Sequence, residues 1–159
     1  MKIIFEPIGT ISTPFKAKEG MPIQAKGATG IKGQVILNEQ LTTGLTDLDG
    51  FSHIILIYHF HKSAEFELLT TPFLDKTKRG VFSTRAPKIP NAIGISVVKL
   101  LSIEKNIINI ENVDMLDGTP LLDIKPYIPD FDNYETEKNG WLGNKTDKIN
   151  DIRSDKRFE

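Results

Sequence analysis

Residues 93–113 have the sequence IGISVVKLLSIEKNIINIENV, and this stretch decides the fold class of the 159-residue chain. Residues 93–103 and 107–113 are rich in isoleucine and valine, which favour extended strands. The three residues between them are polar, a spacing that is typical of a β-hairpin. The stretch therefore predicts two antiparallel strands that lie side by side in a sheet.

Further strand candidates lie on both sides of this hairpin, at residues 3–5 and 8–11 (one strand, bent near Pro7), 34–37, 54–58, 80–83 and 119–124. Residues 54–58 are the most apolar of these and predict a central strand that is buried on both faces. Residues 41–50 indicate turns or one short helix, and residues 63–69 indicate a helical turn. Because strands outnumber helices, we expect a mainly β protein, a small antiparallel β-barrel with short helical turns and a polar C-terminal tail.

The chain divides by composition into two parts. We expect the barrel domain to span residues 1–132 and the tail to span residues 133–159, which are mostly polar and charged. The tail is either solvated or docked through Trp141 and Leu142.

The overall composition, with 39% hydrophobic and 26% charged residues, is ordinary for a soluble globular domain. The chain has no cysteine, which excludes disulfides, thiolate metal sites and cysteine nucleophiles. The N-terminus does not have the pattern of a signal peptide, and no apolar run approaches the ~20 residues of a membrane helix. We therefore expect a soluble, cytoplasmic protein.

Charge is nearly balanced, at a formal net charge of −1, so any site for a polyanion must be a local patch. One candidate cluster contains five basic residues with Phe73 and Phe82 interleaved: Lys76, Lys78, Arg79, Arg85 and Lys88. Such a run is either a track for a phosphate backbone or an ordinary solvated face.

Two polar stretches are candidates for a functional site. Residues 114–129 hold several charged groups, a tyrosine and three prolines next to apolar residues, so the polar groups either satisfy one another or bind a ligand. Residues 84–94 contain two prolines, which stiffen the segment that carries Arg85 and Asn91. Arg85 suits a carboxylate or phosphate and Asn91 suits a base edge, although this segment is equally explained as a rigid connector.

Two other features are weaker signals. The glycines in the long loop over residues 16–33 do not have Rossmann or P-loop spacing, so a nucleotide-like cofactor would bind outside a Rossmann fold. That loop is either functional or a disordered excursion. His53, His59 and His61 share one parity on a strand, but the outer two lie ~20–25 Å apart along it, and we expect no metal site.

The polar stretches carry a family resemblance. The chain resembles the TrmO (TsaA-like, YaeB) family at Ile8 and Gly9, at residues 51–53, 60–61, 80–85, 90–91 and 93–94, at Asp114, and at residues 117–120 and 123–129. The resemblance implies a small β-barrel that binds S-adenosyl-L-methionine (SAM) outside any Rossmann fold, usually as a homodimer. It also implies N6-methylation of threonylcarbamoyl-adenosine at position 37 of tRNA, and it implies neither DNA nor a membrane as a partner.

By this resemblance, the cofactor-binding positions are Ala25, Lys26, Gly27, His61, Lys62, Arg85, Ile95, Asp114, Met115, Leu116, Asp117 and Gly118. Methyl transfer to an amine needs in-line positioning and a group that takes a proton. Asp123 and Tyr127 are the catalytic candidates, with a self-satisfied bracing network as the alternative. Lys88, Asn91 and Lys125 are the candidates for substrate binding.

Two departures from the family pattern bear on the substrate. Ile89 stands where the family usually has an arginine, and the chain ends soon after the barrel, whereas some members carry a further C-terminal domain. Two alternatives are therefore kept: a SAM-dependent methyltransferase with a substrate other than tRNA, and a non-catalytic module that binds SAM or a nucleotide.

Overall fold

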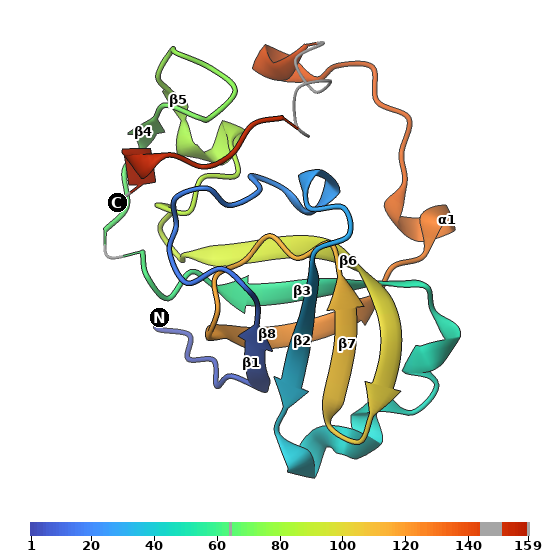
Figure 1. Cartoon of the computed structure of the whole chain (residues 1–159). Helices are drawn as coiled ribbons and strands as arrows, with labels where there is room; N and C mark the ends of the chain where they lie inside the picture. Colours follow the sequence, from blue (N-terminus) through green and yellow to red (C-terminus); the bar gives the residue numbers. More distant parts are fainter. Residues whose placement is uncertain (64, 144–150, 159) are drawn as a thin grey trace.

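Six antiparallel strands close into a barrel in the order β1-β2-β7-β6-β3-β8 (Figure 1). The structure, a computed structural model, describes residues 1–63, 65–143 and 151–158. The barrel strands are β1 (Gly9–Ser12), β2 (Lys32–Leu37), β3 (His53–His59), β6 (Ile93–Glu104), β7 (Ile107–Glu111) and β8 (Thr119–Pro126). Two short strands, β4 (Leu69–Thr70) and β5 (Arg79–Gly80), form a separate sheet, and α1 (Pro129–Asp132) follows the barrel. The expected mainly β barrel is confirmed.

The hairpin that decides the fold class forms as predicted. Strands β6 and β7 pair from Lys99 opposite Glu111 to Glu104 opposite Ile107. Lys105 in the turn has a φ of +58°, the left-handed conformation that a tight polar turn accommodates. Residues 41–50 form short 3-10 helices, Glu39–Leu45 and Leu48–Gly50, in agreement with the expected turns or short helix.

The expectation that the strand at residues 54–58 is buried on both faces is wrong. Ile54, Leu56 and Tyr58 point into the barrel and are buried, whereas Ile55 and Ile57 lie partly exposed on the outside. A small closed barrel has a single core inside it, so each strand alternates between an inner and an outer face.

The strand expected at residues 80–83 is also wrong, because only Gly80 belongs to a strand and Val81–Ser83 form a 3-10 helix. The hydroxyl of Ser83 donates to the Gly80 carbonyl (2.7 Å), and that of Thr84 donates to the Val81 carbonyl (2.7 Å). Serine and threonine hydroxyls that bond to nearby backbone favour turns over strands.

Two other local expectations are not met. Residues 3–5 form no strand, and β1 begins only at Gly9, beyond Pro7. The described residues between 63 and 69 contain no helix, because their polar groups bond elsewhere. The Ser63 hydroxyl donates to the Pro87 carbonyl (3.0 Å), and the Glu67 amide donates to the Lys88 carbonyl (3.3 Å).

Loops and the C-terminal segment (residues 151–158) gather over one end of the barrel, and the helices of residues 39–50 lie at the other end (Figure 1). The indole Nε1 of Trp141 donates to the Ser83 carbonyl (2.7 Å), so this part of the tail docks on the same chain, the second of the two alternatives. Phe158 is buried against Val81, Ala86 and Phe73. No helix in the described part of the chain has the length and apolar character of a transmembrane span.

Gly94 is placed where a side chain has no room. A Cβ there would lie 2.2 Å from Cε2 of Tyr58 and 2.9 Å from Cζ of Phe60. We expect Gly94→Ala to reduce the free energy of unfolding by about 1–3 kcal/mol, the usual effect of overpacking. Urea unfolding measures this, with Gly44→Ala as the matched control because nothing lies within 4 Å of its added Cβ. An equal effect of both variants would contradict the explanation.

Candidate active site

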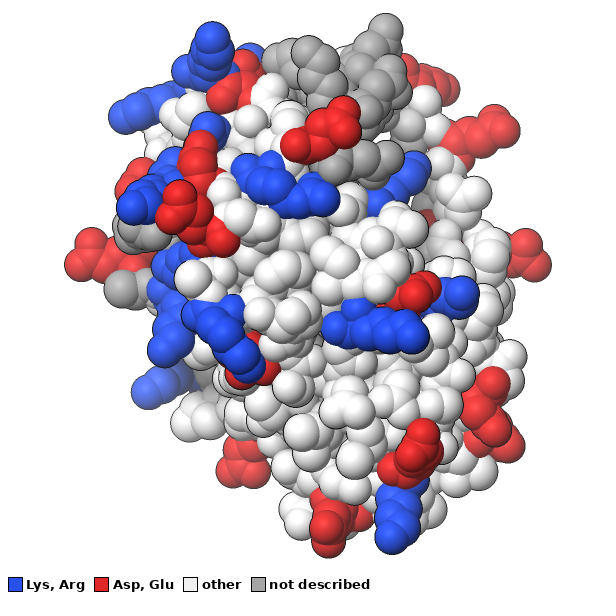
Figure 2. Space-filling model, in the orientation of Figure 1, with Lys and Arg blue, Asp and Glu red and all other residues white. Residues whose placement is uncertain are grey.

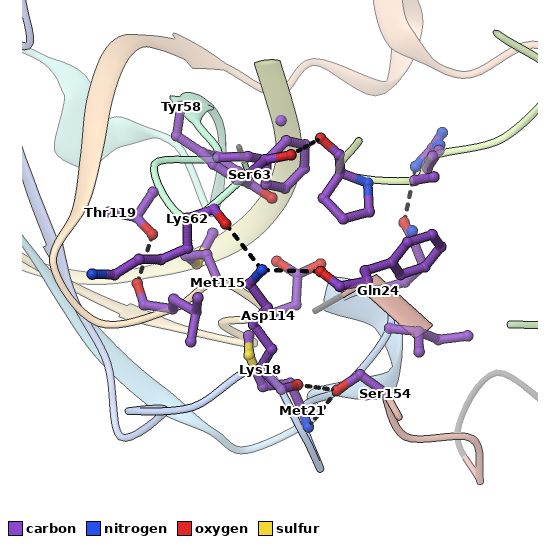
Figure 3. A pocket seen from close by; sticks show the side chains of 18 of the residues that line it. Lys18, Met21, Gln24, Tyr58, Lys62, Ser63, Asp114, Met115, Thr119 and Ser154 are labelled. Atoms are coloured by element: carbon purple, nitrogen blue, oxygen red, sulfur yellow. Dashed lines mark hydrogen bonds between the residues drawn. The ribbon is translucent and has the colours of Figure 1, made fainter. Parts of the chain in front are cut away.

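A pocket with a cavity volume of about 330 Å³ opens at the loop end of the barrel (Figure 3). Its walls include the ends of β3 and β6 and parts of five loop segments: residues 18–24, 60–63, 84–89, 114–116 and 154–158. Met21, Phe60 and Met115 supply apolar surface, while Arg85 and Asp114 supply charge. A mostly apolar hollow with a few convergent polar groups is the usual form of a small-molecule site.

Hydrogen bonds through Ser96 connect two residues that line this pocket, Tyr58 and Asp114. Ser96 lies at an inward position of β6, and its hydroxyl donates to Oδ1 of Asp114 (2.6 Å). The hydroxyl of Tyr58, on the neighbouring strand β3, lies 3.0 Å from Ser96 Oγ. Because Ser96 has one hydroxyl proton and gives it to the carboxylate, Tyr58 is the donor to Ser96. These two hydrogen bonds fix the orientation of the Asp114 carboxylate.

Burial raises the pKa of Asp114 to about 6. The hydrogen bonds from Ser96 and from the Ala25 backbone and the positive charge of Arg85 act in the opposite direction. Burial, followed by the negative charge of Asp114, holds the pKa of Tyr58 well above its usual value. At neutral pH, therefore, Tyr58 keeps its proton while Asp114 is an ionised carboxylate that readily accepts one.

Lys18 joins the pocket wall to the C-terminal segment. Its Nζ donates to the carbonyl of Lys62 (2.9 Å) and to the carbonyl of Phe158 (3.0 Å). The hydroxyl of Ser154 accepts the Met21 amide proton (2.9 Å) and donates to the Lys18 carbonyl. The C-terminal segment is therefore one wall of the pocket, as Figure 3 shows for Lys18, Met21 and Ser154.

A second, wider hollow of about 860 Å³ lies next to the first and shares part of its wall, including Thr84, Arg85 and Ile95. A third, of about 440 Å³, lies beside the helices of residues 39–50. The guanidinium of Arg85 donates to Oε1 of Gln24 (3.1 Å), which fixes it between the first two hollows.

The structure brings many of the expected site residues together. The first pocket contains His61, Lys62, Arg85, Ile95, Asp114, Met115 and Leu116, and the second hollow contains Ala25, Lys26 and Tyr127 together with Arg85 and Ile95. Gly27 ends the 3-10 helix Ala25–Gly27 and is buried outside both. Burial and then the positive charge of Lys62 lower the pKa of His61, which keeps its imidazole neutral.

Other expected residues lie apart from the first pocket. Asp123 lines the third hollow and forms an ion pair with Lys125 (2.8 Å). Lys88, Asn91, Lys125, Asp117 and Gly118 line none of the three hollows. The three histidines do not form a cluster, and no group of three or more possible metal-ligating side chains occurs in the described ranges.

Asp117 has protein partners on three sides. Its carboxylate accepts from the Ser12 hydroxyl (3.1 Å) and the Thr13 amide (3.0 Å), and it pairs with Lys16 (2.6 Å). The hydrogen bond from Lys16 lowers the pKa of Asp117 first, followed by that from the Thr13 amide. The residue therefore ties β1 to the turn before β8.

We accordingly expect Asp117→Ala to lower the melting temperature by about 3–8 °C, for a loss of about 1–2 kcal/mol. The affinity of the first pocket for its ligand should stay within a factor of about two. Differential scanning calorimetry and isothermal titration calorimetry measure the two effects separately. An unchanged melting temperature with a large loss of affinity would instead assign Asp117 to ligand binding.

The sequence reasoning missed Tyr58, Ser96, Lys18 and Ser154. A signal existed for Ser96, because it is a polar residue between Gly94 and Val98 on the strand face that continues to the apolar Leu100. For Lys18 and Ser154 there was none, because their partners lie 44 and 133 or more positions away.

Comparisons with known proteins agree with this architecture. The family described as the tRNA-methyltransferase O N-terminal domain matches residues 10–133. A probable S-adenosyl-L-methionine-binding protein of Pyrococcus abyssi is 50% identical over 158 residues, which cover 99% of this chain and 86% of that protein. A tRNA (adenine(37)-N6)-methyltransferase of Mus musculus is 39% identical over 140 residues, which cover 82% of this chain but only 32% of the mouse protein.

Solved structures agree as well. The crystal structure of TrmO from Pseudomonas aeruginosa is similar with a TM-score of 0.75 at 35% identity, over 89% of this chain and 63% of that chain. The sequence comparison and the structure comparison thus indicate the same family, and the chain belongs to the TrmO family.

Proposed function

We propose that the protein is a SAM-dependent methyltransferase that acts on tRNA, and that its acceptor is the N6 nitrogen of threonylcarbamoyl-adenosine at position 37. The observation that carries the proposal is the half-buried Asp114 carboxylate, which Ser96 orients where two hollows adjoin. The names of the relatives support the cofactor and the tRNA substrate.

The residues of the first pocket suit the proposed cofactor. A SAM molecule combines an aromatic base, sugar hydroxyls, a positively charged sulfur and an amino-acid carboxylate. Met21, Phe60 and Met115 offer apolar surface for the base, Asp114 offers negative charge, and the Arg85 guanidinium suits the carboxylate.

Methyl transfer then needs little more than correct placement of the methyl group and the acceptor nitrogen. The cofactor, when bound, supplies an electrophilic methyl group. The attacking nitrogen loses one proton, and Asp114 holds that proton, since a pKa of about 6 makes it a carboxylate that can accept one at neutral pH. We assign this role to Asp114 instead of Asp123, because Asp123 lies at the third hollow.

We also propose that the protein acts as a cytoplasmic homodimer. The outer faces of β3 and β6 carry an apolar strip in which Ile57 lies opposite Ile95 and Ile55 opposite Val97. Ile95 is 52% exposed and Val97 38%, and an apolar strip of this kind suits a self-complementary contact beside the second hollow, which both residues border. Sedimentation equilibrium tests this, and a monomer at every concentration would refute it.

Transfer of a labelled methyl group tests the function directly. The purified protein is incubated with labelled SAM and total tRNA from cells that lack this activity, and digested nucleosides are identified by mass. Label in N6-methylated threonylcarbamoyl-adenosine is the expected result. In a second reaction an extract of the same cells replaces the tRNA: label in another component would favour the non-tRNA substrate, and SAM binding without transfer in either reaction would favour the non-catalytic module. A melting temperature that does not respond to SAM or to its demethylated product would refute the cofactor.

A further inference from the structure

The second hollow differs from the first in three aromatic side chains that line it alone: Phe82, Tyr127 and Trp141. Phe82 lines it and is 81% exposed, on the 3-10 helix Val81–Ser83. Trp141 and Tyr127 also line it, and both rings are held in place. The Trp141 indole donates to the Ser83 carbonyl (2.7 Å), and the Tyr127 ring meets that of His53 edge-on at 6.4 Å. Rings held around a wide hollow are a stacking platform for flat ligands.

Positive charge lies around the same hollow although the chain as a whole is slightly acidic. Lys26 and Arg85 line it and are exposed. Its wall at Pro72 and Leu74 continues into the segment that carries the exposed Lys76 and Lys78. Figure 2 shows Lys and Arg side chains over the loop end of the viewed face, with acidic side chains among them. Aromatic rings interleaved with cations are typical of surfaces that bind single-stranded nucleic acid.

The two hollows also meet at a chemically useful place. Ser96 lines the second hollow, and its hydroxyl donates to Asp114, which lines the first. A ligand group at the Ser96 side is therefore next to the Asp114 carboxylate that lines the first pocket. This is the arrangement that an acceptor base and a methyl donor in adjoining sites require.

We propose that the second hollow is the acceptor site, where an unstacked base of single-stranded RNA stacks on Phe82 near Trp141 while Lys26 contacts a phosphate. This inference rests on the proposed function and deepens it, since it names the surface that receives the acceptor. It also gives Phe82, which lines the second hollow but not the cofactor pocket, a role.

The test is binding of a fluorescein-labelled stem–loop RNA whose loop contains adenosines, followed by anisotropy in the presence of the demethylated cofactor. Phe82→Ala should weaken RNA binding roughly 5- to 150-fold, the range for loss of one stacking ring. Phe82→Tyr keeps the ring and should restore the affinity. Phe131→Ala is the matched control, because Phe131 is 68% exposed on α1 and lines none of the three hollows.

Two further measurements test the roles of charge and of single-stranded RNA. Lys26→Ala should reduce the slope of log affinity against log salt by about one. A fully paired duplex of the same composition should compete poorly. Equal RNA affinity for Phe82→Ala and wild type, or equal competition by the duplex, would overturn the acceptor-site assignment.

Failure of this inference can be told apart from failure of the proposed function. Calorimetric titration with SAM reports only on the first pocket and should give the same affinity for Phe82→Ala and wild type. If Phe82→Ala still transfers methyl groups to tRNA at the wild-type rate and KM, the function stands and the acceptor site lies elsewhere. If the wild-type protein binds no RNA, the inference is refuted, and the SAM titration still reports on the cofactor.

Discussion

Replacing Asp114 with asparagine is expected to slow methyl transfer by roughly 10²- to 10⁴-fold, the usual worth of a positioned proton acceptor. Asparagine keeps the shape of the side chain and still accepts a hydrogen bond from Ser96, but its amide cannot take a proton. Single-turnover measurements at saturating SAM separate this rate from cofactor affinity, which the lost negative charge also weakens. Asp117→Asn is the control: it changes a carboxylate in the same turn that lies outside the pocket, and its rate should match that of wild type. Equal rates for Asp114→Asn and wild type would remove Asp114 from the chemistry.

The pH dependence gives an independent check. Since Asp114 is protonated below its pKa of about 6, the transfer rate of the wild type should rise roughly tenfold per pH unit below that value and level off above it. The residual rate of Asp114→Asn should lack this step. A wild-type rate that does not change between about pH 5 and about pH 7 would contradict the assignment.

The Asp114 carboxyl should also make the folded state less stable as pH rises. Burial raises the pKa of Asp114 from 3.8 to about 6, so between these values the folded state binds more protons than the unfolded state. Stability is therefore lost as pH rises through this window, by on the order of 3 kcal/mol in total. Urea unfolding of wild type and Asp114→Asn at about pH 4 and about pH 8 should show that the variant loses this part of the pH dependence.

Deleting residues 151–159 is expected to weaken SAM binding at least about tenfold. The deletion removes Phe158, whose burial alone is worth about 1.5–3 kcal/mol, and exposes its neighbour Val81. It also takes away the Phe158 carbonyl that Lys18 contacts, and with it one of the two bonds that hold Lys18 over the pocket. Isothermal titration calorimetry measures the affinity.

A single substitution distinguishes loss of the pocket wall from general unfolding of the protein. Phe158→Leu keeps apolar bulk and the backbone carbonyl, and should retain most of the affinity. The barrel itself should survive the deletion, because its strands pair only with one another. Full SAM affinity in the deleted protein would show that the C-terminal segment lies on the pocket without contributing to it.

The sequence predicts those parts of the structure whose contacts join residues close together in the chain, and it fails where the contacts join distant residues. The β6–β7 hairpin depends on neighbours in sequence, and its composition and turn were sufficient to predict it. The crowded polar stretch over residues 114–129 was resolved only by contacts from far away: Asp117 is held by β1, about a hundred positions earlier, and Asp123 lies at a different hollow from Asp114. Spacing along the chain therefore placed in one group carboxylates that the barrel separates.

The C-terminal segment illustrates the same limit. Its composition is as expected for a solvated tail, yet Ser154 pairs with the backbone of Met21 in both directions, through its amide and its hydroxyl. Nothing within the segment signals this, because the partner is a loop at the other end of the chain. Trp141 was recognisable as an anchor, since a large aromatic residue in a polar stretch usually has a contact to make.

The pairing of β1 with β8 closes the barrel, with Gly9 opposite Leu121 and Ile11 opposite Thr119. Each barrel strand consequently has a neighbour on both sides, and no barrel edge offers free amide and carbonyl groups to a second chain. Among the described residues, the strands with a free edge are β4 and β5, of two residues each, too short to template further pairing. A deletion of β1 would expose the edges of both β2 and β8. The protein would then be open to intermolecular strand pairing and prone to aggregation.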